Sequence, residues 1–148
     1  LAAVLDQIGA ECRREGLRLC YHNHSFEFVQ FDGQYALDLL YENCSPENVA
    51  CELDTYWVAH GGADPVEYVR KYGERIGILH LKDMADDEER SFTEVGSGLL
   101  DWPAIHEAAT AAGVKWYCVE QDRCPGDPVD SARRSAEFVR SRLGVPAL

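Results

Sequence analysis

The sequence predicts an α/β fold in which short strands alternate with helices around one parallel sheet. Apolar runs typical of buried strands occur four times, and a segment with helical periodicity follows each of them. Glycines and Asp-Pro pairs mark the junctions. The 148 residues, 46% of them hydrophobic, suffice for one core, so we expect a single domain over residues 1–148.

Each element has a local signal in the first half of the chain. A helical pattern over residues 2–15 stops at Gly16, and an apolar strand is expected over 17–23. The stretch FEFVQFDG (26–33) indicates a second extended piece that closes in an Asp-Gly turn. A helix over 34–43 and a strand over 49–59 follow, and this strand runs into a loop at Gly61–Gly62.

The second half repeats the alternation. Three helices begin with an aspartate at the N-cap and a proline in the first turn, over residues 64–72, 101–113 and 127–143. Strands are expected over 76–82 and 115–121. The polar segment 83–98 is too long for a plain connector, and Gly96 and Gly98 favour a flexible lid there.

Composition excludes several classes of protein. The formal net charge is −12 and the basic residues form no stripe, so a nucleic-acid partner is disfavoured. No window is apolar enough for a membrane span, and a cytoplasmic location is the default expectation. The six cysteines include no C-x-x-C pair and are expected to be reduced, with Cys20, Cys51 and Cys118 buried in strands.

Polar pairs close all four expected strands. Residues i and i+2 of a strand point to the same face, and the carboxyl ends of parallel strands meet where βα barrels and sheets bind ligands. The pairs are His22 and His24, Glu52 and Asp54, His80 and Lys82, and Glu120 and Asp122. Imidazoles and carboxylates at one rim suit a single divalent cation such as Mn²⁺, Mg²⁺, Co²⁺ or Zn²⁺.

Five stretches in order resemble the sugar phosphate isomerase/epimerase family: YHNHSFEF (21–28), ELDTYWVAHGGADPVEYVRKYGERI (52–76), HLKDM (80–84), EVGSGLLDWPAI (94–105) and VEQD (119–122). These are xylose isomerase-like TIM barrels, which include inosose dehydratases, ketose 3-epimerases and endonuclease IV-type enzymes. The resemblance implies a (β/α)8 barrel. Such a barrel needs eight βα units and ~250 residues, so we expect this chain to be the C-terminal four units. The missing half, or a second copy in a homo-oligomer, would then cover its open edges.

The resemblance also implies site residues. The metal ligands would be Glu27, Asp54, His80 and Glu120, with His22 or His24 as alternatives to Glu27. The expected catalytic groups are Glu27, Glu120, Lys82 and His22, and the expected substrate-binding groups are His24, Trp57, Asp122 and Arg123. Trp57 stands where several relatives carry a histidine, and a packed core aromatic is an equal alternative for it.

The function implied is metal-dependent isomerisation or epimerisation of a sugar, with proton transfer next to a carbonyl through an enediolate. A small sugar or polyol-derived molecule would be the substrate. The same site could instead expel a hydroxyl, as a dehydratase or lyase acting on an inosose or 3-keto-sugar. Two further readings are an apurinic endonuclease, which the acidic charge disfavours, and a non-catalytic half-barrel.

Overall fold

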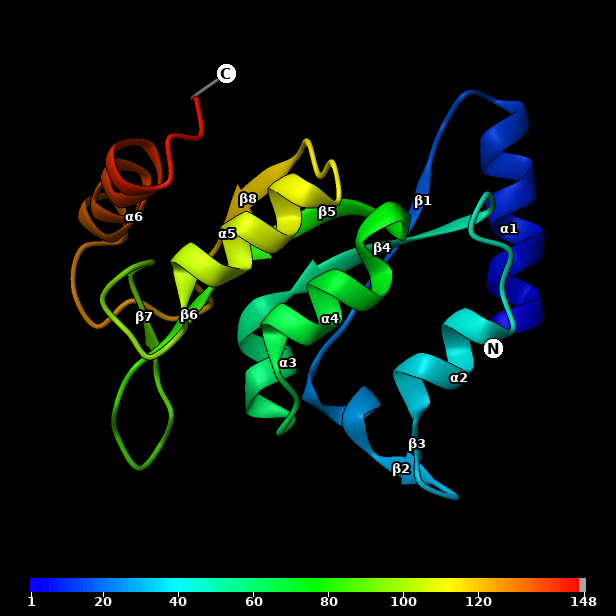
Figure 1. The fold of residues 1–148 in the computed structure, drawn as a ribbon, viewed down its shortest axis with the longest axis horizontal. Coiled ribbons are helices and arrows are strands. Elements are labelled where there is room, and N and C mark those ends of the chain that lie inside the picture. Colours follow the sequence, from blue (N-terminus) through cyan, green and yellow to red (C-terminus); the bar gives the residue numbers. More distant parts are fainter. Residues whose placement is uncertain (147–148) are drawn as a thin grey trace.

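A computed structural model describes residues 1–146 and contains a four-stranded parallel sheet in the order β1-β4-β5-β8 (Figure 1). Its strands are β1 (Leu19–His22), β4 (Val49–Asp54), β5 (Ile76–Leu81) and β8 (Tyr117–Val119). The helices are α1 (Ala2–Arg14), α2 (Ala36–Glu42), α3 (Thr55–His60), α4 (Pro65–Tyr72), α5 (Trp102–Ala111) and α6 (Pro128–Arg142). Short elements complete the fold: η1 (Ser25–Phe28), η2 (Gly73–Arg75), and the pairs β2 (Gln30–Phe31) with β3 (Gln34–Tyr35) and β6 (Asp83–Met84) with β7 (Phe92–Thr93).

The predicted alternation of strands and helices is confirmed, and so are the three aspartate caps. The carboxylates of Asp64, Asp101 and Asp127 accept hydrogen bonds from backbone N–H groups in the first turns of α4, α5 and α6. These bonds satisfy donors that a helix N-terminus leaves without an intrahelical partner. Local capping chemistry therefore fixed these boundaries.

Two predicted strands were wrong in part. The segment 49–59 is extended only to Asp54, because the Asp54 side chain accepts a hydrogen bond from the backbone of Trp57 and starts α3. In the stretch 26–33, the first residues belong to η1 and the rest form a tight hairpin with β3. Asp32 and Gly33 turn this hairpin with positive φ values of 50° and 84°, as a two-residue hairpin loop requires.

The pairing of β4 with β5 changes register at Gly77. Cys51 is paired with Ile76, but the next residue, Glu52, is paired with Ile78. The extra residue shifts β5 by one position, so that His80 lies beside Asp54. A side chain at Gly77 would bring its Cβ within 2.8 Å of the Cys20 sulfur, so glycine suits this position.

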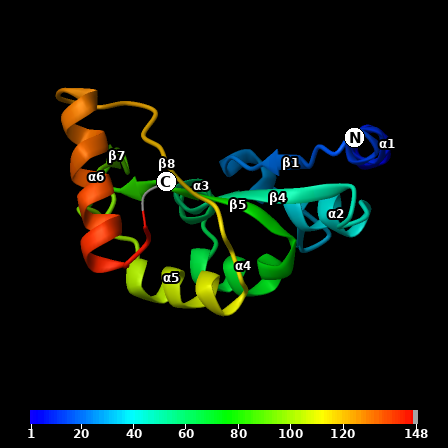
Figure 2. The same cartoon turned by 90° about the horizontal axis from the view of Figure 1, so that it is seen from above.

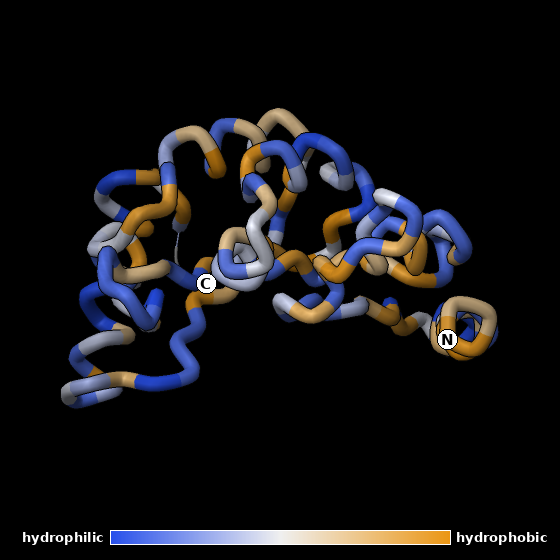
Figure 3. The backbone as a smooth tube through the Cα atoms, turned by 90° about the horizontal axis from the view of Figure 1, so that it is seen from below, coloured by the Kyte–Doolittle hydropathy of each residue, from blue (hydrophilic) through white to orange (hydrophobic). Residues whose placement is uncertain are grey.

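The two faces of the sheet differ. Helices α2, α4 and α5 lie on one side, where Leu53, Leu79 and Leu81 are buried in the core (Figure 2). Hydrophobic and hydrophilic residues follow one another along the coiled segments (Figure 3). On the opposite side, a hollow of about 490 Å³ is lined in part by Ile78 and Trp116.

The cysteines and the helices bear on two further expectations. All six cysteines lie within the described residues and are free thiols. Cys51 is buried as expected, but Cys20 is only half-buried and Cys118 is exposed, because both line the open hollow. Over residues 1–146, none of the helices has both the length and the apolar character needed to cross a bilayer.

Arg75 joins the amino-terminal ends of the strands to α2, away from the polar strand ends. Its guanidinium donates to the carbonyl oxygens of Tyr41, Cys44 and Val49 at 2.6, 3.0 and 2.8 Å. We expect Arg75→Met to lower the free energy of unfolding by about 2–3 kcal/mol, because three carbonyls lose a charged donor. Arg70→Met, at an exposed ion pair, is the control and should change it by less than about 0.5 kcal/mol. Urea denaturation of the two variants tests this, and equal losses would contradict it.

Candidate metal centre

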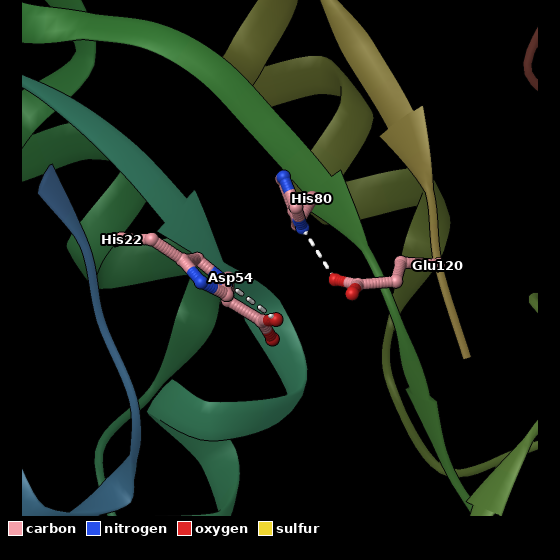
Figure 4. A group of neighbouring side chains, drawn as sticks. All are labelled: His22, Asp54, His80 and Glu120. Atoms are coloured by element: carbon pink, nitrogen blue, oxygen red, sulfur yellow. Dashed lines mark hydrogen bonds and ion pairs between the residues drawn. The ribbon is translucent and has the colours of Figure 1, made fainter. Parts of the chain in front are cut away.

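Four side chains from the four strands of the sheet meet at its C-terminal edge (Figure 4). His22 ends β1, Asp54 ends β4, His80 lies in β5, and Glu120 follows the last residue of β8. Each offers one ligand-type atom, and these atoms all lie within 4.8 Å of one another. The structure thus brings together three of the four predicted metal ligands, and His22 is the fourth member of the group.

Contacts inside this group join it in pairs. His22 Nε2 lies 3.1 Å from Asp54 Oδ2, and His80 Nδ1 lies 2.7 Å from Glu120 Oε2. The second nitrogen of His80, Nε2, lies 2.7 Å from a carboxylate oxygen of Glu52. His80 is therefore held between two carboxylates, an arrangement that fixes the orientation of its ring.

Lys82 places a buried ammonium group against the cluster. Its side chain is 1% exposed, and Nζ lies 3.0 Å from each of three carboxylates, those of Asp54, Glu120 and Asp122. The ring faces of Trp57 and Phe92 lie 5.6 and 5.8 Å from the same nitrogen. Ammonium and carboxylate groups at this depth need such partners, because an unpaired buried charge is costly.

Negative charge exceeds positive charge at this rim. Burial lowers the pKa of Lys82, but Asp54 and the other carboxylates outweigh it, so the pKa is raised and the ammonium is retained. Burial raises the pKa of Glu120, but hydrogen bonds from Lys82 and His80 bring it below its usual value. The hydrogen bond to Asp54 raises the pKa of His22 against the effect of burial. Several carboxylates around one ammonium favour a further cation.

Small polar residues beside the cluster hold the backbone, and sequence reasoning missed them. Asn23, which is fully buried, accepts a hydrogen bond from the Asp54 N–H through its side-chain oxygen at 2.9 Å. Thr55 Oγ1 lies 3.0 and 3.1 Å from the carbonyl oxygens of His80 and Lys82. Their position next to charged residues at strand ends was the available signal.

Glu27, the first choice for the remaining ligand, lies outside the group. Its carboxylate accepts hydrogen bonds from the Tyr21 hydroxyl at 2.7 Å and from the His24 N–H at 2.8 Å. One oxygen thus caps the short helix η1 at His24, and the other holds the Tyr21 side chain of β1. The place expected for Glu27 is taken by His22, which was the stated alternative.

The expected substrate-binding aromatics lie beside the cluster. The His24 ring is 5.0 Å from the His22 ring and 5.2 Å from the Trp57 ring, measured between centroids. The ring of Phe92, from β7, lies 5.7 Å from the Trp57 ring between centroids. Phe92 was not predicted from the sequence as part of the site. A position in a long polar loop gave no sequence signal for it.

The two polar residues expected after β8 differ in their contacts. Asp122 binds Lys82 and so belongs to the charged network. Arg123 has no ion pair among residues 1–146 and lines a separate hollow of about 400 Å³ with Tyr56, Phe92 and Cys124. This hollow lies next to the cluster, because Phe92 borders both.

The glycine loop is not a free lid, because Asp83 binds it. The Asp83 carboxylate is fully buried and accepts five hydrogen bonds at 2.7–3.2 Å. Its donors are the backbone N–H groups of Met84, Gly96, Gly98 and Leu100 and the indole N–H of Trp102. The expectation of a flexible lid was therefore wrong for this loop.

The same loop is also joined to α6. Ser131 donates to Glu94 at 2.8 Å, and the Val95 N–H donates to Ser135 at 3.1 Å. Burial raises the pKa of the Glu94 carboxyl, but the Ser131 hydrogen bond, and then Arg134 at 3.1 Å, bring it below its usual value. The loop thus connects the end of β5 to the last helix.

The donor set fits a divalent cation. Two imidazoles and two carboxylates form the mixed N/O set that Mn²⁺, Co²⁺ and Zn²⁺ accept. The four ligand-type atoms lie within 4.8 Å of one another, so one ion between them could contact all four side chains. A parallel βα sheet with such groups at its C-terminal edge is characteristic of the class of βα proteins, barrels among them, that bind ligands at this edge.

Comparison with known proteins places the chain within this class. Residues 1–142 match the family model described as xylose isomerase-like TIM barrel, and the chain belongs to that family. Its curated relatives include an inosose dehydratase of Lacticaseibacillus casei, 28% identical over 99% of this chain and 55% of the relative. Another, from Geobacillus thermodenitrificans, is 26% identical over 95% of this chain and 53% of the relative. The chain spans about half the length of the curated relatives it matches.

Solved structures agree. A sugar phosphate isomerase/epimerase from Parabacteroides distasonis superposes with a TM-score of 0.85 at 29% identity, over 98% of this chain and 52% of that one. An L-ribulose 3-epimerase superposes with a TM-score of 0.72 at 19% identity, over 97% of this chain and 52% of that one, which supports the fold alone. The predicted barrel family and its α/β fold are thus confirmed.

Asp83 gives a test of the loop that borders the site. Asp83→Asn should lower the free energy of unfolding by about 3 kcal/mol or more, because the NH₂ group of asparagine would face buried N–H donors that now bind a carboxylate oxygen. Asp101→Asn is the matched control, and should change it by a few tenths of a kcal/mol because asparagine caps helices well. Urea denaturation gives the energies. Amide hydrogen exchange at Gly96 and Gly98 should accelerate only in the Asp83 variant, and unchanged exchange there would refute the role given to Asp83.

Proposed function

We propose that this site belongs to a metal-dependent enzyme that transfers a proton next to the carbonyl of a sugar or polyol-derived substrate, as an isomerase or epimerase does. The observation that carries the proposal is the meeting of His22, Asp54, His80 and Glu120 at one strand edge. Membership of a family with enzymes among its relatives supports it.

The four clustered side chains would hold one divalent cation, whose charge would polarise the substrate carbonyl and acidify the neighbouring C–H bond. Asp54 is fully buried, so its role is confined to binding and to capping α3. The Glu120 side chain is 40% exposed, and its contacts with His80 and Lys82 both use Oε2, which leaves Oε1 for a substrate. Glu120 is therefore the group we propose to remove the proton.

Neighbouring groups would bind and orient the substrate. The Lys82 ammonium can donate to the oxygen that gains negative charge, and His24 can donate to a hydroxyl. The indole of Trp57 offers an apolar face to the C–H side of a sugar ring. Asp122 holds Lys82 through an ion pair. Arg123 lines the adjoining hollow, where its guanidinium would bind an anionic group of a substrate.

Elimination is the second candidate outcome. The same loss of a proton next to the carbonyl, followed by departure of a β-hydroxyl, would make the protein a dehydratase. Curated relatives named inosose dehydratases, 28% and 26% identical over almost the whole chain, favour this outcome. The proton abstraction step is common to both candidates, so the same residues serve either one.

Metal binding is the first test. Calorimetric titration with Mn²⁺ should give one equivalent bound to the wild type, and His80→Ala should weaken binding by roughly 100-fold or more, because loss of a second-shell group alone costs 10–100-fold. His106→Ala, on helix α5 and outside the four-residue group, is the matched control and should bind as the wild type does. Equal Mn²⁺ affinity in all three proteins would refute the proposed site.

Product analysis is the second test. Incubated with Mn²⁺ and either an inosose or a ketose, the protein should release an unsaturated carbonyl product with new ultraviolet absorbance, or an epimer without it. Glu120→Gln should lower kcat by roughly 10²–10⁴-fold, the usual contribution of a general base. Retention of full turnover by Glu120→Gln would exclude Glu120 as the base.

A further inference from the structure

We infer that Lys82 is the built-in counter-ion of the candidate metal centre and that a divalent cation binding there displaces its ammonium group from Asp54 and Glu120. The inference rests on the proposed function and adds a role to one residue of that site. Lys82 then acts as a positioning residue before the cation binds and becomes available to substrate afterwards.

The oxygens that Lys82 binds are the ones that face the histidines. Asp54 Oδ2 lies 3.0 Å from the ammonium and 3.1 Å from His22 Nε2. Glu120 Oε2 lies 3.0 Å from the ammonium and 2.7 Å from His80 Nδ1. The ammonium is thus paired with two of the oxygen atoms that a cation at the cluster would bind.

The ammonium and a divalent cation cannot both bind these two oxygens without weakening each other's interaction with them. An ion bound at ~2.0–2.2 Å would draw both carboxylates toward itself and would repel the ammonium, which is in hydrogen-bond contact with the same atoms. Divalent charge attracts the carboxylates more strongly than a single positive charge does. The ammonium is therefore the group that moves.

A place for the displaced ammonium exists nearby. Asp122 already accepts a hydrogen bond from Lys82 at 3.0 Å and does not belong to the four-residue group. The rings of Trp57 and Phe92 face the same nitrogen and can attract a cation. A shift toward these three residues keeps Lys82 paired and brings it to the side where the predicted substrate contacts lie.

The first experiment compares Mn²⁺ affinity in Lys82→Met and the wild type by calorimetry. Lys82→Met should bind Mn²⁺ about tenfold more tightly, the factor that repulsion between charges of +1 and +2 at about 5 Å gives even at the dielectric constant of water. Lys82→Arg keeps the charge and should show no gain. Lys71→Met also removes a lysine paired with a carboxylate, that of Asp38, and should leave affinity unchanged.

The second experiment needs no variant, in case Lys82→Met does not fold without metal. Acylation of the wild-type lysines, read by mass spectrometry with and without Mn²⁺, should increase severalfold at Lys82 when Mn²⁺ is present. Lys71 and Lys115, the other two lysines of the sequence, should react equally in both samples.

The outcomes separate the inference from the function it rests on. Absence of Mn²⁺ binding to the wild type would contradict the proposed metal site and the inference with it. Mn²⁺ binding with unchanged Lys82 labelling, or with equal or weaker affinity in a folded Lys82→Met, would overturn the inference alone. A role of Lys82 in stability only would lower the melting temperature of the variant without raising its affinity for Mn²⁺.

Discussion

The register shift between β4 and β5 is the constraint on which the site depends. Without the extra residue at Gly77, the pairing that begins with Cys51 and Ile76 would set Asp54 opposite Leu79. Side chains alternate along a strand, so His80 would then face the helices and Leu79 the open side. The shift reverses this and brings His80 to the side of Asp54, while Leu79 and Leu81 fill the core.

Asp54 couples this geometry to the fold. One oxygen of its carboxylate accepts the Trp57 N–H and starts α3, while the other faces His22 and Lys82. A substitution at Asp54 therefore affects both a helix start and the charged cluster. The effects of a substitution at His80 are easier to interpret, because its ring contacts Glu120, Glu52 and His22 at the site and caps no helix.

Sequence reasoning found the parts that depend on local rules. Strand alternation placed His80 and Lys82 on one face, and Asp-Pro signals placed the starts of two helices. The helix at Thr55–His60 was missed because its tyrosine, tryptophan and valine favour strands, and one capping bond overrides that preference. Similarly, a glycine-containing loop suggests mobility. Only the position of Asp83 in the folded chain shows that the backbone N–H groups of Gly96 and Gly98 are hydrogen-bonded to its carboxylate.

The choice between Glu27 and His22 could not be made from the sequence for a comparable reason. Which of the two faces the cluster depends on whether the chain stays extended after His22, and the hydrogen bond from the His24 N–H to the Glu27 carboxylate starts η1 there instead. A ligand set in which a second imidazole replaces a carboxylate carries one negative charge fewer. The retained Lys82 ammonium then offsets a larger share of the remaining charge.

The open face of the sheet has two regions with different side chains. Toward the amino ends of the strands it is lined by Ile78, Trp116 and two cysteines, side chains that barrels of this class bury in their interior. Toward the carboxyl ends it carries the charged cluster, and all four of those side chains come from this chain. The proposed cation site is therefore built from these four strands alone, whereas enclosure of a substrate depends on what covers the hollow below. This difference is why metal affinity, before turnover, is the measurement that reports on the site itself.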